Sequence, residues 1–223
     1  FFHPAMPDEP LIFVEVALTK AIPGSVTKLL SEGRTPLEAE DAKVAVFYSI
    51  SNCQKGLSGI SFGNQLIKQV VAELSLAFPK LKEFVTLSPI PGLNRWLATQ
   101  TDDPEQGHVA TAILEKHAAP KDVRAMAARY LMLAKRDDGM PRVPVARLHL
   151  GNGAEIDHIH ADADTSANGI AQSSGAMVNS LYDLSRTQRR HEDYALKSVI
   201  AAAKPAHAIS TATLSAKPKE TSS

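Results

Sequence analysis

Hydrophobic and polar positions follow two periodicities along the chain. Runs of branched and aromatic residues, continuous or alternating with polar ones, are typical of strands and occupy residues 11–19, 44–50, 84–87, 145–150 and 154–160. Apolar residues at helical spacing predict helices over 25–30, 66–78, 93–98, 109–117, 121–135, 167–184 and 186–203. Strands and helices therefore mix along the whole chain, which predicts one α/β domain.

The most informative stretch runs from residue 44 to residue 78, where a strand, a loop and a helix follow one another. The loop carries Gly56, Gly59 and Gly63. Glycine allows close backbone approach to a ligand, and the first amides of the following helix have no intrahelical partner, so this is a candidate anion site. The spacing is neither a Walker pattern nor a GxGxxG fingerprint. A loop that only turns the chain stays open as an alternative.

Charge and cysteine content exclude several classes of protein. The 24 basic and 24 acidic residues cancel, so we expect neither nucleic acid nor a membrane as partner. No apolar run approaches the ~20 residues that span a bilayer. The single cysteine, Cys53, excludes an intramolecular disulfide and fits a reducing compartment, from which we predict a cytoplasmic location. We expect Cys53 to be a small packing residue, since no basic neighbour lowers its pKa.

The two ends of the chain differ from its middle. The first residues resemble no signal peptide and include no initiator methionine, so we expect the chain to begin inside a larger protein. Residues 207–223 are mostly Ser, Thr, Lys and Ala with few apolar anchors. We therefore predict a folded domain over residues 1–206 and a disordered tail over residues 207–223.

Two residues stand where a side chain could be held for chemistry. Ser88 opens the sequence SPIPG, whose prolines end the strand in a rigid bend. His149 lies in LHLGNG, at the end of the predicted strand 145–150, and its ordinary pKa of ~6.5 suits proton transfer. Structural roles are the alternatives: Ser88 as a residue that caps the bend, and His149 as a hydrogen-bonded strand residue.

The segment IDHIHADAD offers a competing interpretation. In an extended chain His158, His160, Asp162 and Asp164 would share one face and could bind zinc or a similar ion. Their spacing matches no named metal motif, so we expect no metal site here.

Four blocks, taken in order, carry a resemblance to a known family: PDEPLIFVEVALT, AVFYSISNCQKGLSGISFGNQLIKQVV, TLSPIPG and LHLGNGA. They resemble malonyl-CoA decarboxylase, specifically its C-terminal catalytic domain, over residues 1 to about 201. The resemblance implies a fold similar to the GNAT N-acetyltransferases, with a mixed central sheet flanked by helices. It also implies that the family's N-terminal helical domain is not represented in this chain.

The resemblance assigns a binding loop for coenzyme A. By analogy with the family, the CoA pyrophosphate would be held by backbone amides of Ser58, Gly59, Ile60, Ser61, Phe62, Gly63 and Asn64. The family often has an acidic residue where this chain has Ser61, so any role of that carboxylate does not carry over.

The same resemblance assigns Ser88 and His149 as the catalytic pair. It implies decarboxylation of malonyl-CoA to acetyl-CoA and CO2, in fatty acid metabolism, without a cofactor because the thioester accepts the electrons. It does not say which residue of the pair delivers the proton. Asn179 and Tyr182 resemble a family position near the acyl end of the substrate, and the full-length protein is expected to be a homo-oligomer.

Three alternatives remain open. An acyl-CoA-dependent N-acetyltransferase would share the fold and the CoA loop but needs an amine site. A non-catalytic CoA-binding fragment would fit a chain that lacks a preceding domain. A metal hydrolase built on His158 and His160 is the most distant of the three.

Overall fold

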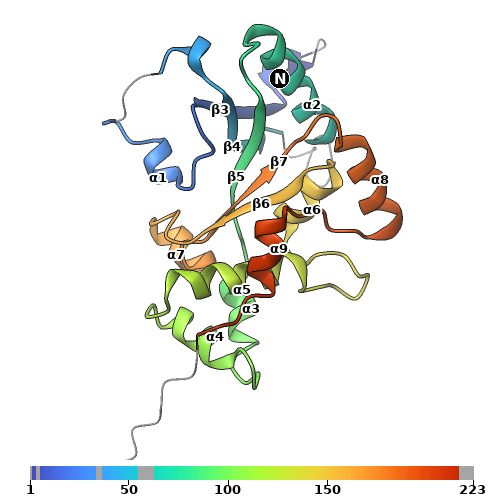
Figure 1. The fold of residues 1–223 in the computed structure, drawn as a ribbon. Coiled ribbons are helices and arrows are strands. Elements are labelled where there is room, and N and C mark those ends of the chain that lie inside the picture. The colour runs from blue at the N-terminus through green and yellow to red at the C-terminus, as the bar shows by residue number, and fades with distance from the viewer. Residues whose placement is uncertain (1, 4–5, 34–36, 55–62, 216–223) are drawn as a thin grey trace, which may run out of the picture.

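The protein is built on one five-stranded mixed sheet (Figure 1). The computed structural model describes residues 2–3, 6–33, 37–54 and 63–215. In spatial order the strands are β3 (Ile12–Thr19), β4 (Val44–Asn52), β5 (Glu83–Pro89), β7 (Met177–Leu181) and β6 (Glu155–His160). Two short strands, β1 (Phe2–His3) and β2 (Met6–Pro10), form a separate antiparallel pair. The predicted α/β class, with a mixed central sheet, is confirmed.

The pairing of β4 with β5 shapes the centre of the sheet. These strands are parallel, whereas all other neighbours in the five-stranded sheet are antiparallel. Their pairing begins at Val44 and Glu83 and ends at Phe47 and Thr86, although β4 continues to Asn52 and β5 to Pro89. The carboxyl ends of the two strands therefore separate and leave a wedge in the middle of the sheet.

Helices cover the sheet unevenly, and three apolar clusters result. The largest cluster joins β6 and β7 to the helices α3 (Leu93–Ala98), α4 (Gly107–Leu114), α5 (Pro120–Met132), α6 (Pro144–Gly151) and α9 (Lys204–Ser210). A second cluster packs α2 (Gly63–Ala77) against β4 and β5 through Ile67, Val71, Phe47 and Phe84. The third involves α1 (Val26–Leu29), and the remaining helical segments are η1 (Ala39–Asp41), α7 (Ala167–Ser173) and α8 (Thr187–Lys197). Within the described residues, no helix combines the length and apolarity that crossing a membrane requires.

Residues 145–150 are helical, so the predicted strand was wrong. Pro144 occupies the first turn of α6, where its fixed φ favours a helix and its missing N–H costs nothing. The residues at Val145, Arg147 and His149 alternate with apolar ones, which suggested a strand. Val145, Leu148 and His149 also fit the spacing of a helix, and the helix is the structure that forms. The strand predicted over 154–160 is present as β6, which pairs with β7 and not with residues 145–150.

Residues 167–184 were predicted as one helix, and this was wrong as well. Helix α7 ends at Ser173, and Ser174 and Gly175 both have positive φ, which turns the chain into β7. Strand β7 lies between β5 and β6, yet it contains the buried polar residues Asn179 and Ser180. A central strand that is buried on both faces is usually recognised by a continuous apolar run, and these polar residues interrupt that run.

The last part of the chain is ordered further than predicted. Helix α8 ends at Lys197, and residues 201–203 then run along the free edge of β6, where the Ile156 N–H donates to Ala201 O and the Ala203 N–H donates to Ile156 O. The prediction of disorder is wrong for residues 207–215: α9 extends to Ser210, and the Ser215 hydroxyl donates to Asp122 at 2.6 Å. Residues 216–223 lie outside the described part.

Candidate active site

The structure brings Ser88 and His149 together although 61 residues separate them. Ser88 lies on β5 beyond the last residue that pairs with β4, and His149 lies in the last turn of α6. The distance from Ser88 Oγ to His149 Nε2 is 3.4 Å. The exposed fractions are 8% for Ser88 and 4% for His149, so both groups face each other away from bulk water.

Tyr182 supports His149 from the other side of the ring. It follows β7 directly, and its hydroxyl lies 2.8 Å from His149 Nδ1. Burial lowers the pKa of His149 to about 4, so the imidazole is neutral at neutral pH. Burial also raises the pKa of the Tyr182 hydroxyl, which keeps the phenol protonated. The imidazole is therefore a neutral group held between two hydroxyls.

Thr86 completes the polar cluster on the same face of β5. Ser88 Oγ donates to Thr86 Oγ1 at 3.2 Å, and the backbone N–H of Ser180 donates to the same oxygen at 3.3 Å. Thr86 and Ser88 share a face because side chains alternate along a strand. The Ser88 hydroxyl is thus oriented by its own strand and by β7.

The pair lines a small pocket that fills the wedge between β4 and β5. Its volume is about 280 Å³. The walls are Phe47, Tyr48, Ser49, Ile50, Thr86, Leu87, Ser88, Pro89, Val145, Leu148 and His149. An apolar cleft with a few converging polar groups is the usual form of a site for a small molecule.

Asn179, in contrast, does not contact the pair. It is fully buried on β7, opposite Leu87, and its amide donates to Thr86 O at 3.0 Å and to Pro23 O at 3.2 Å. Because Leu87 and Ser88 point to opposite faces of β5, Asn179 lies behind the sheet relative to the pocket. Of the two residues that we expected near the acyl end, only Tyr182 reaches the pair.

The predicted CoA loop is mostly beyond the part of the chain that the structure describes. Ser58, Gly59, Ile60, Ser61 and Phe62 lie outside the described residues. Gly63 and Asn64 begin α2, which follows β4 as the sequence predicts. The assignment of the loop to CoA therefore stays a prediction.

The histidines of IDHIHADAD have other partners. The rings of His158 and His160 stack with centroids 6.0 Å apart, while His158 Nδ1 meets Asp157 at 2.7 Å and His160 Nε2 meets Asn179. Asp164 accepts from the Ser166 N–H at the start of α7. Among the described residues, no group of three His, Cys, Asp or Glu side chains could hold a metal ion.

Cys53 differs from its expected role as a packing residue. It follows the end of β4 and is exposed. Its side chain therefore contributes little to the core.

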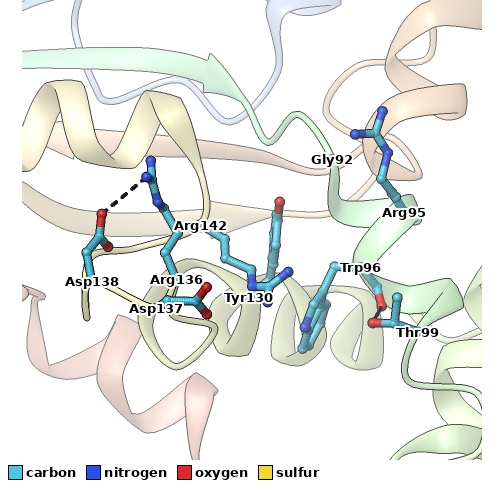
Figure 2. A pocket seen from close by; sticks show the side chains of 9 residues that line it. All are labelled: Gly92, Arg95, Trp96, Thr99, Tyr130, Arg136, Asp137, Asp138 and Arg142. Atoms are coloured by element: carbon cyan, nitrogen blue, oxygen red, sulfur yellow. Dashed lines mark hydrogen bonds and ion pairs between the residues drawn. The ribbon is translucent and has the colours of Figure 1, made fainter.

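A second, larger hollow lies beyond the bend that follows β5 (Figure 2). Its volume is about 560 Å³, and Trp96 stacks on Tyr130 in its floor with ring centroids 5.2 Å apart. Figure 2 shows exposed arginine side chains around this floor, among them Arg95, Arg136 and Arg142. Arg136 pairs with Asp138 at 3.2 Å. None of the candidate catalytic, CoA-binding or metal-binding residues named from the sequence lines this hollow.

Comparison with known proteins places the chain in a family. A family profile described as the malonyl-CoA decarboxylase C-terminal domain matches residues 1–222. The mitochondrial malonyl-CoA decarboxylase of Anser anser anser is 36% identical over 87% of this chain, and that of Rattus norvegicus is 33% identical over 84%. The matches cover 45% of either relative, so the chain spans about half their length.

Solved structures agree with this assignment. The malonyl-CoA decarboxylase from Rhodopseudomonas palustris has a TM-score of 0.86 and 45% identity, over 93% of this chain and 51% of that one. The enzyme from Agrobacterium vitis has a TM-score of 0.88 and 42% identity, over 95% of this chain and 56% of that one. A GNAT-like decarboxylase, GphF, shares the fold at a TM-score of 0.52 and 16% identity, over 82% of this chain and 76% of that one. The chain belongs to the malonyl-CoA decarboxylase family, whose C-terminal domain it represents.

Proposed function

We propose that this domain decarboxylates malonyl-CoA to acetyl-CoA and CO2, with Ser88 and His149 as the catalytic pair. The observation that carries the proposal is the buried contact between Ser88 Oγ and His149 Nε2 at the wall of the pocket between β4 and β5. Membership of the malonyl-CoA decarboxylase family supports the choice of substrate.

The pair can stabilise the intermediate of this reaction. As the bond to the carboxylate carbon breaks, its electrons move onto the thioester carbonyl, CO2 leaves, and an enolate forms. The enolate carbon then takes one proton, which comes ultimately from solvent. A hydrogen-bond donor aimed at the enolate oxygen is worth ~2.7–4 kcal/mol in a site that excludes water. Ser88 and His149 are the two groups whose burial and position suit this task.

The substrate would enter along the wedge. On this proposal the glycine-containing loop from Ser58 to Asn64 holds the CoA phosphates at the start of α2, and the acyl end lies between β4 and β5. No organic cofactor or metal is needed, because the thioester carbonyl itself accepts the electrons. Malonyl-CoA and acetyl-CoA are then the ligands, with no nucleic acid or membrane as partner.

Two wider expectations stay predictions. We expect the full-length protein to be a homo-oligomer, because the family resemblance implies it. The cytoplasmic location rests on the single cysteine, whereas the relatives from Anser anser anser and Rattus norvegicus are named as mitochondrial enzymes.

The test is to incubate the protein with malonyl-CoA alone and to measure CO2 release and acetyl-CoA formation. We expect turnover by the unmodified protein and a large loss of kcat in Ser88→Ala, with CoA affinity unchanged by calorimetry. Ser31→Ala is a matched control, because Ser31 is exposed and distant in sequence from the pair. CoA binding without any CO2 release would support a non-catalytic CoA-binding domain instead. Acetyl transfer from acetyl-CoA to amines would support an N-acetyltransferase.

A further inference from the structure

The face of the sheet opposite the pocket carries a hydrogen-bonded group that the proposed mechanism does not use. Its centre is Asn179 on β7, whose side chain is fully buried. On the same face of β7, Met177 and Leu181 belong to an apolar cluster that includes Leu87, the partner of Asn179 on β5. A buried amide in an apolar layer is unfavourable unless its hydrogen bonds are made. The partners of this amide therefore show what it holds in place.

These partners fix the orientation of the Asn179 amide. Its nitrogen, Nδ2, lies 3.0 Å from Thr86 O and 3.2 Å from Pro23 O. Carbonyl oxygens can only accept, so both amide protons point at these two atoms. The amide oxygen, Oδ1, then faces His160 Nε2, which has to be the donor of their hydrogen bond.

The ring of His160 is confined between β7 and the segment that follows β3. A Cβ atom on Gly24 would lie 2.7 Å from His160 Nδ1, so this edge of the ring packs directly on the Gly24 backbone. Pro23, whose carbonyl accepts from the buried amide, is the preceding residue. The Ser25 hydroxyl donates to Ala163 O at 3.0 Å and ties the same segment to the chain just after β6. The ring therefore has little freedom to turn its Nε2 away from the amide.

Thr86 is the residue through which this group reaches the pocket. It is the last residue of β5 that pairs with β4, so it stands where the two strands separate. Strand β7 holds it at two atoms, because Asn179 Nδ2 donates to its carbonyl oxygen and the Ser180 N–H donates to its Oγ1 at 3.3 Å. The same Oγ1 accepts from Ser88 Oγ at 3.2 Å. The position of Thr86 therefore decides where the Ser88 hydroxyl points.

We propose that Asn179 is a positioning residue that acts through Thr86 on Ser88. His160 fixes the orientation of the Asn179 amide from behind the sheet. The catalytic consequence rests on the proposed function, because a serine that is displaced by about 1 Å from its productive position can lower turnover about 10²-fold. The hydrogen-bond group itself does not depend on that function.

The first experiment concerns the direction of the bond between His160 and Asn179. Burial, the largest effect, lowers the pKa of His160, so the ring is neutral at neutral pH and has one proton. NMR on the unmodified protein labelled with 15N-histidine, without substrate, should show this proton on Nε2, and the spectrum of His160→Gln identifies the signals. A proton on Nδ1 would mean that Asn179 Oδ1 does not accept from the ring, and it would overturn the proposal.

Variants of His160 test whether the group affects turnover. His160→Leu removes the donor to Asn179, and we expect a roughly 10- to 100-fold lower kcat for malonyl-CoA, with CoA affinity unchanged by calorimetry. His160→Gln supplies an amide N–H in place of the ring N–H and should restore most of the lost kcat. The matched control is His158→Leu, because His158 lies on the same strand, its side chain is 53% exposed and its hydrogen bond goes to Asp157.

A local measurement separates this role from the decarboxylase assignment. Hydrogen exchange by NMR reports on the Ser180 N–H, which donates to Thr86 Oγ1. We expect His160→Leu to lose protection at Ser180, and His160→Gln and His158→Leu to keep it. This result in a protein that releases no CO2 would support the role of Asn179 and remove only the proposed function.

A second pair of variants tests the path if His160→Leu does not fold. Thr86→Val removes the hydroxyl that accepts from Ser88 and keeps the shape of the side chain, whereas Thr86→Ser keeps the hydroxyl. We expect a roughly 10- to 100-fold lower kcat in Thr86→Val and a smaller loss in Thr86→Ser. Equal kcat in these two variants would contradict the proposal. So would unchanged kcat and protection in a folded His160→Leu, or a loss of kcat that His160→Gln does not restore.

Discussion

The two hollows on either side of the bend after β5 differ in how far their polar side chains are removed from water, and this difference runs opposite to their sizes. The pocket beside Ser88 and His149 measures about 280 Å³, half the volume of the arginine-rich hollow at about 560 Å³. Yet the small pocket holds a histidine whose pKa falls to about 4, whereas Arg95, Arg136 and Arg142 stand in water. Desolvation, more than volume or charge, is what changes the reactivity of a side chain.

The difference comes from how each hollow is built. The small pocket forms where two parallel strands of the sheet separate, so core residues surround it on several sides. The large hollow lies between α3, α5 and the loop before α6, at the surface of the helical layer. Water screens its charges, and exposed ion pairs such as Arg136–Asp138 contribute little.

The largest expected effect is the loss of the histidine in the small pocket. His149→Ala should lower kcat for malonyl-CoA about 10²- to 10³-fold, because one donor to the enolate oxygen is worth that much. If Ser88 and His149 act as one unit, the double variant should be no slower than the slower single variant. Steady-state kinetics measure this, with the exposed His117→Ala as control. Full activity of His149→Ala would mean that the buried histidine of the small pocket matters no more for turnover than the exposed side chains of the large hollow.

The next effect concerns how the free energy of unfolding depends on pH. His149 is neutral in the folded protein down to about pH 4, whereas in the unfolded chain its pKa is ~6.5. The unfolded state therefore binds more protons between these values, and the free energy of unfolding falls as the pH drops from 6.5 to 4. We expect a loss on the order of 3 kcal/mol from this residue. Urea unfolding at a series of pH values should show a shallower dependence for His149→Gln.

A smaller effect is expected from Tyr182→Phe. The substitution keeps the ring but removes the hydroxyl from His149 Nδ1, so the imidazole loses its orientation. We expect kcat to fall by roughly tenfold, with CoA affinity retained, in line with the loss of a partner behind a functional histidine. Tyr48→Phe is the matched control, because Tyr48 lines the same pocket and, among the residues that the structure describes, no hydrogen bond or ring contact joins it to His149. Equal kinetics for both variants would contradict a role for Tyr182.

The smallest effect is expected in the large hollow. Arg95→Ala and Arg142→Ala should leave kcat and KM for malonyl-CoA within about twofold, since exposed surface substitutions rarely matter beyond ~0.5 kcal/mol. The same kinetic assay measures this. A large rise in KM in either variant would mean that the substrate reaches this hollow and that its arginines contribute to binding.

Much of the fold could be predicted from local apolar periodicity, and the two residues of the candidate site could be predicted from sequence motifs. The strands and helix between residues 44 and 87 have simple apolar periodicities, and the structure confirms them. Ser88 and His149 were identified from the blocks around them, even though His149 lies on a helix and not on the predicted strand. Their proximity is confirmed, while their chemical roles stay predictions.

The remaining parts depend on contacts that no local pattern contains. Strand β7 escaped notice because Asn179 and Ser180 are buried polar residues, and each is satisfied by Thr86, more than 90 residues earlier in the chain. Asn152, between two glycines in the sequence GNG, is buried at the end of α6, which its local sequence does not indicate.

The segment that runs beside β6 has a consequence for association between molecules. A free strand edge offers unpaired peptide groups to any other extended chain and so invites aggregation. Here residues 201–203 occupy the edge of β6, and α9 follows at once. A chain that ended before Ala201 would expose this edge beside the buried side chains of β6 and β7, and we expect it to form fibres or amorphous aggregates on storage.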